Sequence, residues 1–272
     1  MNSFRRLLWV EMRRAMHRRF VRWMIALALA FCALTGVIAF TSSRDPSKLG
    51  SDHPVHMATW WTTGGGGGDS LLLSAALFLV FGAAMCGASV GGAEWRAGTI
   101  TTGLTWEPSR VRLHAARTAS AAIMAFLIGF ALQIVFLAST LPAVFLNGST
   151  TGTDGDWWVG LFLATTRISV ITAMIAVLAV NIATIGRNTS AALIGIAVWA
   201  FVAERTIAGL KPGWARFLIG ENVATVVPWT ALEDVGFDRP PTVALATLLF
   251  YLAIIVVVAT STFVRRDVAA SS

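Results

Sequence analysis

Long apolar runs separated by short polar segments are the dominant pattern along this 272-residue chain. A helix needs about 20 apolar residues to cross ~30 Å of hydrocarbon, because it rises 1.5 Å per residue. Six runs qualify, and charge is nearly absent from all of them, as a medium that cannot solvate ions requires. We expect six membrane-spanning helices, at Trp23–Thr41, Ser70–Gly92, Thr118–Leu146, Trp157–Gly186, Thr189–Ala203 and Thr242–Val264.

Composition indicates the same class of protein. Hydrophobic residues make up 56% of the chain and charged residues 13%, whereas a soluble domain has about 45–50% and about 25%. Too little charge is available to cover a water-facing surface, so a soluble globular enzyme is excluded. Cys32 and Cys86 both lie inside apolar runs, and a disulfide framework is not expected.

Basic residues fall mainly on one side of the predicted membrane. Of the 21 Lys and Arg residues, 14 lie in the N-terminal segment, the loop between the second and third spans, the loop with Arg187 and the C-terminal tail. The positive-inside rule makes this side cytoplasmic. Both termini are then cytoplasmic, in agreement with an even number of spans. The net charge of +7 therefore indicates a topology, and we do not expect a nucleic-acid partner.

Residues 1–22 have the pattern of an amphipathic helix. Apolar side chains recur every fourth residue from Phe4 to Phe20, and arginines occupy most of the other faces. We expect this helix to lie in the membrane interface, where anionic lipid attracts its arginines. Either the arginines only orient the chain, or they also dock lipid or a partner. The candidate residues are Arg13, Arg14, Arg18 and Arg19.

The remaining chain divides into a transmembrane region, 23–264, and a cytoplasmic tail, 265–272. Within the transmembrane region, the apolar run of segment 206–241 is interrupted too often to cross the membrane, yet the segment is too apolar for a solvated loop. We expect short helices there that dip into the outer half of the membrane or cover the outer mouth of a pathway. An external cap without a transport role is the alternative.

Arg167 is the ionisable residue within the spans that needs an explanation. If the fourth span begins at Trp157, Arg167 lies ~15 Å deep, where an unpaired charge is costly and indicates a functional role. If the span is Ile168–Gly186, Arg167 anchors its outer boundary, and residues 157–166 form an external or re-entrant segment. We favour the second arrangement because it requires no buried partner.

The sequence lacks the groups that would supply chemistry or energy. The predicted spans contain no interior Asp or Glu, which disfavours a carrier driven by protons or sodium. No Walker A sequence or pattern of a membrane hydrolase is present. His53 and His56 form an isolated pair, so we expect no metal site. The chain is therefore expected not to be an enzyme and to bind no cofactor of its own.

The loop at about 92–116 is the most informative segment. Glu94 and Arg96 close the second span, and Gly98 would end its helix. Pro108 suits the first turn of the next helix. A simple connector would be more polar and would not need this geometry. On the second span itself, Ala83, Gly87 and Gly91 follow one another at four-residue spacing, which would allow close contact with another helix.

This loop resembles the first cytoplasmic loop of the permease subunits of type-2 ATP-binding-cassette (ABC) exporters. The family pattern is Glu, three residues, Gly-Thr, then Pro-Ser-Arg and a basic residue in the next helix. The matching residues here are Glu94, Gly98, Thr99, Pro108, Ser109, Arg110 and Arg117, the last where the family more often has Lys. The amphipathic helix, six spans, apolar segment before the last span and short tail are also similar.

The resemblance implies a permease subunit in a bacterial cytoplasmic membrane. Two copies, identical or paralogous, would form an export path and bind two separate ATPase subunits that hydrolyse ATP with Mg²⁺. The loop from Glu94 to Arg110 would dock on the ATPase and transmit its closure to the spans. A membrane-anchored accessory or assembly protein that recruits a cytoplasmic partner is the alternative. The sequence does not specify a substrate.

Overall fold

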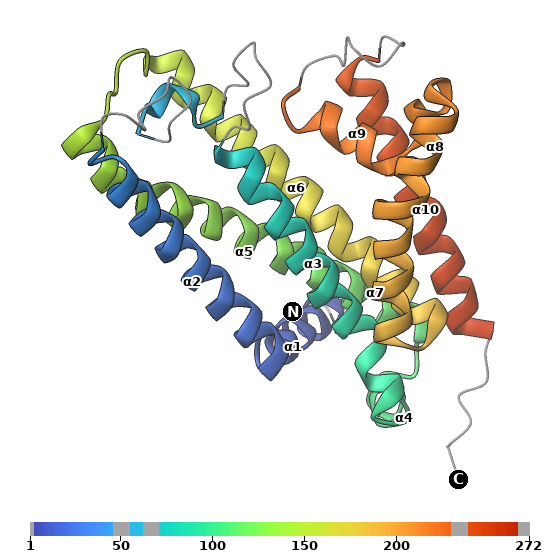
Figure 1. Cartoon of the computed structure of the whole chain (residues 1–272). Helices are drawn as coiled ribbons and strands as arrows, with labels where there is room; N and C mark the ends of the chain where they lie inside the picture. The colour runs from blue at the N-terminus through green and yellow to red at the C-terminus, as the bar shows by residue number, and fades with distance from the viewer. Residues whose placement is uncertain (1–2, 46–54, 62–70, 230–238, 266–272) are drawn as a thin grey trace.

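The computed structural model describes residues 3–45, 55–61, 71–229 and 239–265, and the elements in these ranges are all helical (Figure 1). In chain order they are α1 (Ser3–Met16), α2 (Arg19–Ser42), η2 (Met57–Thr59), α3 (Leu71–Arg96), α4 (Ile100–Trp106), α5 (Arg110–Asn147), α6 (Gly155–Gly186), α7 (Thr189–Val198), the π-helical turn η3 (Trp199–Ala203), α8 (Glu204–Leu210), η4 (Pro212–Phe217), α9 (Ile219–Val226) and α10 (Pro241–Arg265). The predicted all-α fold is confirmed.

Within the described ranges, six helical segments are long and apolar enough to cross a membrane. They are Arg19–Ser42, Leu71–Trp95, Arg110–Asn147, Gly155–Gly186, Thr189–Leu210 and Pro241–Arg265. Each contains one of the six predicted spans or most of it. This is the pattern of a multi-pass membrane protein.

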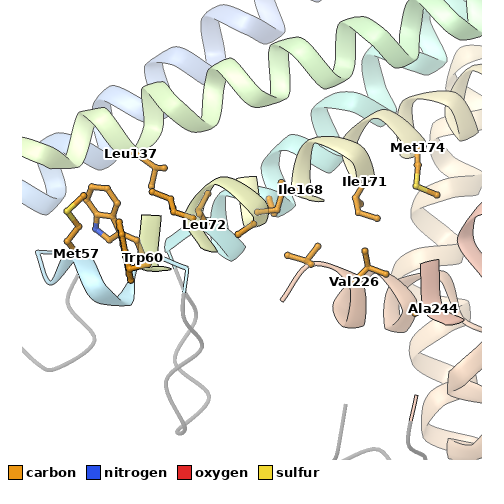
Figure 2. Packing of buried hydrophobic residues seen from close by; sticks show 14 of the residues in the cluster. Met57, Trp60, Leu72, Leu137, Ile168, Ile171, Met174, Val226 and Ala244 are labelled. Carbon is orange, nitrogen blue, oxygen red and sulfur yellow. The ribbon is translucent and has the colours of Figure 1, made fainter. Parts of the chain in front are cut away.

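α6 is the central helix of the bundle. It packs against α3, α5, α7 and α10 (Figure 1), and the most apolar window of this helix is 61% buried, against 11% for α2. Figure 2 shows Ile168, Ile171 and Met174 of α6 along the apolar core, with Val226 of α9 and Ala244 of α10 on its other side. Side chains elsewhere on the outer helices face outward and are exposed, as lipid contact requires.

The N-terminal amphipathic helix is shorter than the predicted 1–22. α1 ends at Met16, and Arg18 adopts an extended backbone (φ −64°, ψ 126°) before α2 begins at Arg19. The four-residue apolar repeat continues through this break, so periodicity alone could not reveal it. Ala15 packs against Val90 of α3 and Ala121 of α5, and this tertiary contact turns α1 away from the axis of α2.

α6 is one continuous helix of 32 residues, or ~48 Å. Asp154 caps its start by accepting the backbone N–H of Trp157 at 2.9 Å. The hydroxyls of Thr165 and Thr166 bond to carbonyls four residues earlier and leave the helix intact. A separate re-entrant segment at 157–166 is therefore wrong, and the alternative of an external segment at 157–166 remains a prediction. Because 48 Å exceeds the thickness of the hydrocarbon, the helix extends beyond it at one end or both.

The fifth apolar helix does not end at Ala203, as predicted, but continues through η3 and α8 to Leu210. This places Glu204, only 7% exposed, inside a candidate span. Its carboxylate accepts the indole N–H of Trp199 (2.8 Å) and the backbone N–H groups of Ile219 (2.9 Å) and Gly220 (2.8 Å) at the start of α9. A helix N-terminus favours a negative charge, so the carboxylate is stabilised there. The expectation of spans without interior carboxylates is wrong for this segment.

The segment 206–241 contains short helices, as predicted: the end of α8, η4 and α9. Val226 and Val227 at the end of α9 pack into the core beside α6 (Figure 2). The insertion of these helices into the membrane remains a prediction. Residues 230–238, the glycine run 64–68, His53 and most of the tail 265–272 lie outside the described residues.

Candidate functional site between α3 and α5

The connection between α3 and α5 is a compact helical loop, here called the α4 loop (residues 97–109). α3 ends at Arg96, and Gly98 has a φ of +66°, in the left-handed region that favours glycine. The backbone N–H of Thr99 then bonds to the carbonyl of Glu94 at 3.1 Å, which closes the turn. α4 begins at the next residue, so the predicted helix end at Gly98 has a conformational cause.

One face of α4 packs against the rest of the protein. Ile100 and Leu104, one helical turn apart, contact Leu113 of α5, Phe263 of α10 and Leu7 of α1. Thr102, Thr105 and Trp106 are exposed on the other faces, and Trp106 is 85% exposed. α4 is therefore fixed on its inner side and presents an aromatic side chain on its outer side.

The start of α5 is held on both sides. Ser109 is the N-cap, and its hydroxyl accepts the backbone N–H of Arg112 at 3.4 Å. Glu107 accepts the backbone N–H of Ser109 (3.1 Å) and pairs with Arg112 (3.3 Å). Pro108 precedes the cap and does not occupy the first helical turn as expected, because that turn begins at Arg110.

Arg110 joins this loop to the last helix. Its guanidinium donates to the backbone carbonyl of Val264 at 3.2 Å, near the C-terminus of α10. A cation stabilises the unpaired carbonyls at such a helix end. The start of α5 and the end of α10 therefore form one unit with α4.

A group of charges, buried except for Arg14, lies where α1, α3 and α5 meet; we call it the charge cluster (Glu11, Arg14, Arg18, Glu94 and Arg117). Glu94 accepts from Arg18 (3.2 Å), from Arg14 (3.4 Å) and from Arg117. Glu11 pairs with Arg14 at 3.3 Å and lies 3.7 Å from the Nε atom of Arg117. Glu11, Glu94 and Arg117 are each at most 7% exposed. The cluster joins the N-terminal helix to both helices that carry the α4 loop.

Burial shifts the titration of the cluster members that lie outside the spans. Desolvation raises the pKa of the Glu11 carboxyl, and the neighbouring Arg117 opposes this shift. Desolvation likewise lowers the pKa of the Arg18 guanidinium, against the attraction of Glu94. The buried charges of Glu11, Glu94 and Arg117 are stabilised mainly by their partners, so removal of one of them leaves another uncompensated.

The four arginines predicted to act together in the N-terminal helix divide into two pairs. Arg14 and Arg18 reach the carboxylate of Glu94, and Arg18 also donates to the backbone carbonyl of Ser89 at 2.8 Å. Arg13 and Arg19 are exposed, and their contact with anionic lipid remains a prediction. The side chain of Arg96 lies outside the described part of the chain.

The small residues of α3 lie against the central helix. A Cβ added at Gly87 or Gly91 would overlap the backbone carbonyl of Ala176 or Val180 of α6, and Ala83 is buried one turn earlier on α3. α3 and α6 therefore approach backbone to backbone along this line.

Arg167 projects from α6 without an ion pair among the described residues. Its Nε donates to the carbonyl of Leu163 (3.1 Å), its guanidinium lies 5.7 Å from the ring of Trp229, and Nη1 is buried without a hydrogen-bond partner. Its role as a boundary anchor or as part of a pathway remains a prediction.

Sequence reasoning missed three contributors to this region: Glu11, Trp106 and a buried pair, His114 and Asn181. Asn181 donates to the carbonyl of Val177 (2.7 Å), so its oxygen accepts from Nε2 of His114 (3.0 Å). His114 comes directly after Leu113, which packs on α4. A signal for Glu11 was present, since it falls on the same helix stripe as Leu7 and Ala15.

Replacing Asn181 by leucine is expected to lower the free energy of unfolding by about 1–3 kcal/mol, because Nε2 of His114 loses the acceptor that it has among the described residues. Thermal unfolding followed by tryptophan fluorescence in detergent measures the effect. A double variant, Asn181→Leu with His114→Phe, should recover part of the loss, since neither polar partner remains. A single variant as stable as the wild type would contradict this account of the pair.

No protein-family model matches the chain, and no curated protein is significantly similar to it. The fold and the α3–α5 connection define an all-α chain with six candidate membrane spans in its described part and a short helical loop between two of them. A fold of this kind serves many functions, so the function has to come from the chemistry of the loop and its surroundings.

Proposed function

We propose that this chain is the permease subunit of a bacterial ABC exporter in the cytoplasmic membrane. Two copies, identical or paralogous, form the substrate path. Separate ATPase subunits bind ATP and Mg²⁺ and dock on the α4 loop, which transmits their closure to α3 and α5. The chain itself is not an enzyme in this proposal.

The observation that carries this proposal is the way the α4 loop is fixed. The turn at Gly98 joins it to α3, and Ile100 and Leu104 belong to one apolar cluster with residues of α1, α5 and α10. Arg110 and the charge cluster join these helices to one another. A push on its outer face therefore reaches four helices at once. Packed interfaces of this kind shift between discrete arrangements instead of deforming gradually, which makes them suitable relays.

The proposed topology is supported by where the arginines gather. α1, the α4 loop and the end of α10 contact one another at one end of the bundle (Figure 1). Residues 1–22, residues 110–117 at the start of α5 and Arg265 at the end of α10 together carry 11 of the 21 Lys and Arg residues, and the positive-inside rule makes their side cytoplasmic. An ATPase in the cytoplasm would then meet the exposed face of α4.

A photoreactive amino acid at position 106 tests the proposal in intact cells. We expect a cross-link to a cytoplasmic protein that hydrolyses ATP, and purification of the complex should recover vanadate-sensitive ATPase activity. A membrane-anchored accessory protein, the alternative, would cross-link to a protein without this activity. That result would overturn the exporter assignment.

Replacing Trp106 by alanine is expected to reduce ATPase binding by at least about tenfold, because an exposed tryptophan on a rigid helix is a typical interface hot spot. Folding should be unchanged, since the side chain is 85% exposed. Co-purification of the ATPase and thermal unfolding measure the two effects.

Trp214→Ala is the matched control, because Trp214 is also exposed (64%) but lies in η4, in the segment assigned to the outer side. It should leave ATPase binding unchanged. Equal binding by the Trp106→Ala variant and the wild type would remove the α4 face from the proposed interface.

A further inference from the structure

The side of α1 that faces away from the bundle carries arginines around an exposed tryptophan. Arg5, Trp9 and Arg13 follow one another at four-residue spacing and therefore lie on one face of the helix. Arg6, three residues before Trp9, lies beside them. All three arginines are exposed, and Trp9 is 63% exposed. We call these four residues the outward face of α1.

The charge of the outward face is not balanced by the protein. Within the described residues, the ion pairs of α1 belong to Glu11, Arg14 and Arg18. Glu11 is the one acidic residue of α1 and is buried on the opposite side of the helix. The outward face therefore presents three positive charges and no negative charge, and its electrostatic complement is an anionic surface.

Exposed apolar side chains on α1 narrow the choice of that surface. Besides Trp9, Val10 and Met16 are also exposed. Water would leave these apolar side chains solvated, whereas hydrocarbon would leave three guanidinium groups without solvation. The headgroup region of a bilayer accommodates both kinds of side chain, because indole rings and long basic side chains settle there.

The chain places α1 beside a membrane boundary. α1 ends at Met16, and α2, which is a candidate span, begins at Arg19 (Figure 1). Trp23, near the start of α2, is 72% exposed, as expected for a ring at the edge of the hydrocarbon. The headgroups of the adjoining leaflet are therefore within reach of the outward face.

The inner side of α1 contacts the α4 loop and its supports. Leu7 belongs to the same apolar cluster as Ile100 and Leu104 of α4, and Glu11 lies 3.7 Å from the Nε atom of Arg117. A ligand that binds α1 only in this position stabilises the position, because binding shifts the equilibrium toward the bound arrangement.

We propose that the outward face of α1 binds the headgroups of anionic phospholipids, and that bound lipid holds α1 against the α4 loop. The three arginines donate to phosphate oxygens, and Trp9 enters the interface beside them. Arg14 and Arg18, which the sequence placed among the candidate docking residues, are not part of this site, because both pair with Glu94. The proposal does not rest on the export function, since α1 and α4 belong to one chain.

Titration of the full-length protein in a neutral detergent with short-chain phosphatidylglycerol tests the site, and native mass spectrometry measures the dissociation constant. The triple variant Arg5→Gln, Arg6→Gln and Arg13→Gln should bind this lipid at least about tenfold more weakly, since each arginine near an anionic surface contributes about fivefold. Phosphatidylcholine of the same chain length has no net charge and should bind both proteins equally. Equal binding of phosphatidylglycerol by the wild type and the triple variant would overturn the proposal.

Two matched variants separate this face from total charge and from folding. Arg205→Gln, Lys211→Gln and Arg216→Gln together remove the same charge from exposed residues elsewhere and should leave phosphatidylglycerol binding unchanged. Lysine at the three arginine positions of the outward face keeps the charge and should retain most of the binding. A loss in either matched variant as large as in the glutamine variant would contradict recognition of the lipid by the charge of this face.

Hydrogen exchange in nanodiscs measures the effect of the lipid on α4. When phosphatidylglycerol replaces part of the phosphatidylcholine, peptides from residues 3–16 and 100–106 should exchange at least about threefold more slowly in the wild type. The glutamine triple variant should show no such difference. Identical exchange of the wild type in both lipids would refute the claim that lipid holds α1 against the α4 loop.

A photoreactive amino acid at position 9 distinguishes a lipid partner from a protein partner in intact cells. We expect cross-links to phospholipid, identified by mass spectrometry of the labelled peptide. Cross-links to a cytoplasmic protein in place of phospholipid would assign the outward face to that protein and overturn the proposal. A failure of ATPase docking at Trp106 would leave these lipid measurements unaffected, so the two proposals can fail separately.

Discussion

Replacing Glu94 by glutamine is expected to lower the free energy of unfolding by about 3 kcal/mol, which corresponds to a midpoint lower by roughly 6–12 °C. The Glu94 carboxylate receives hydrogen bonds from Arg14, Arg18 and Arg117. An amide lacks the charge and turns two N–H donors toward these groups. Three guanidinium groups would then share the single carboxylate of Glu11. Thermal unfolding in detergent at neutral pH measures the change.

Glu107→Gln is the control for this prediction. Glu107 lies in the adjoining α4 loop and also pairs with an arginine, but the side chain of Arg112 is 42% exposed and solvent screens the pair. Its loss should cost no more than about 1 kcal/mol. Equal unfolding midpoints for Glu94→Gln and Glu107→Gln would show that burial of the charge cluster does not matter for stability.

The charge cluster also links the N-terminal helix to the proposed relay. Glu94 lies in the last turn of α3, Arg117 lies in α5 two turns after its start, and Glu11 belongs to α1. Their ion pairs are direct contacts among these three helices, so α3 cannot shift against α5 without changing the surroundings of Glu11. The N-terminal helix is therefore tied to any movement of the α4 loop, a connection that its predicted role as a lipid anchor did not include.

The six apolar helices were accessible from the sequence because length and hydropathy are local properties. The ends of these helices could not be predicted in the same way, because tertiary contacts decide where they lie. The charges of Glu204 and Arg205 indicated the end of the fifth predicted span. The Glu204 carboxylate is instead satisfied by N–H groups at Ile219 and Gly220, 15 and 16 residues later. A pattern along one helix cannot show that a later segment returns to pair with it.

Only part of the candidate site could be predicted from the sequence, because some of its contacts join residues that are far apart in the chain. Gly98 acts through its own backbone conformation, and its residue type indicated the end of a helix. The start of the next helix was assigned to Pro108, whereas the cap is Ser109. The partner of Arg117 across the cluster, Glu11, is more than a hundred residues away in the chain. Neither residue's type specifies that pairing. Trp106 was overlooked because exposure of an apolar side chain follows from the orientation of α4.

The contact between α3 and α6 is expected to be the least tolerant of added volume in the bundle. The double variant Gly87→Ala and Gly91→Ala should lower the free energy of unfolding by about 3 kcal/mol, because two methyl groups would overlap the carbonyls of Ala176 and Val180. Val180 is fully buried in the central helix, so α6 cannot move away without disturbing its other contacts. Each single variant should lie between the double variant and the wild type.

Gly82→Ala on the same helix is the control, because a Cβ there meets no atom within 4 Å. Alanine has the higher helix propensity, by about 1 kcal/mol, so this substitution should leave the unfolding midpoint unchanged or raise it. Gly91→Ala as stable as Gly82→Ala would contradict the close approach of the two backbones. Both variants replace glycine by alanine on the same helix. A stability change of opposite sign at Gly91 and at Gly82 therefore separates the effect of the contact with α6 from that of the helix propensity of alanine.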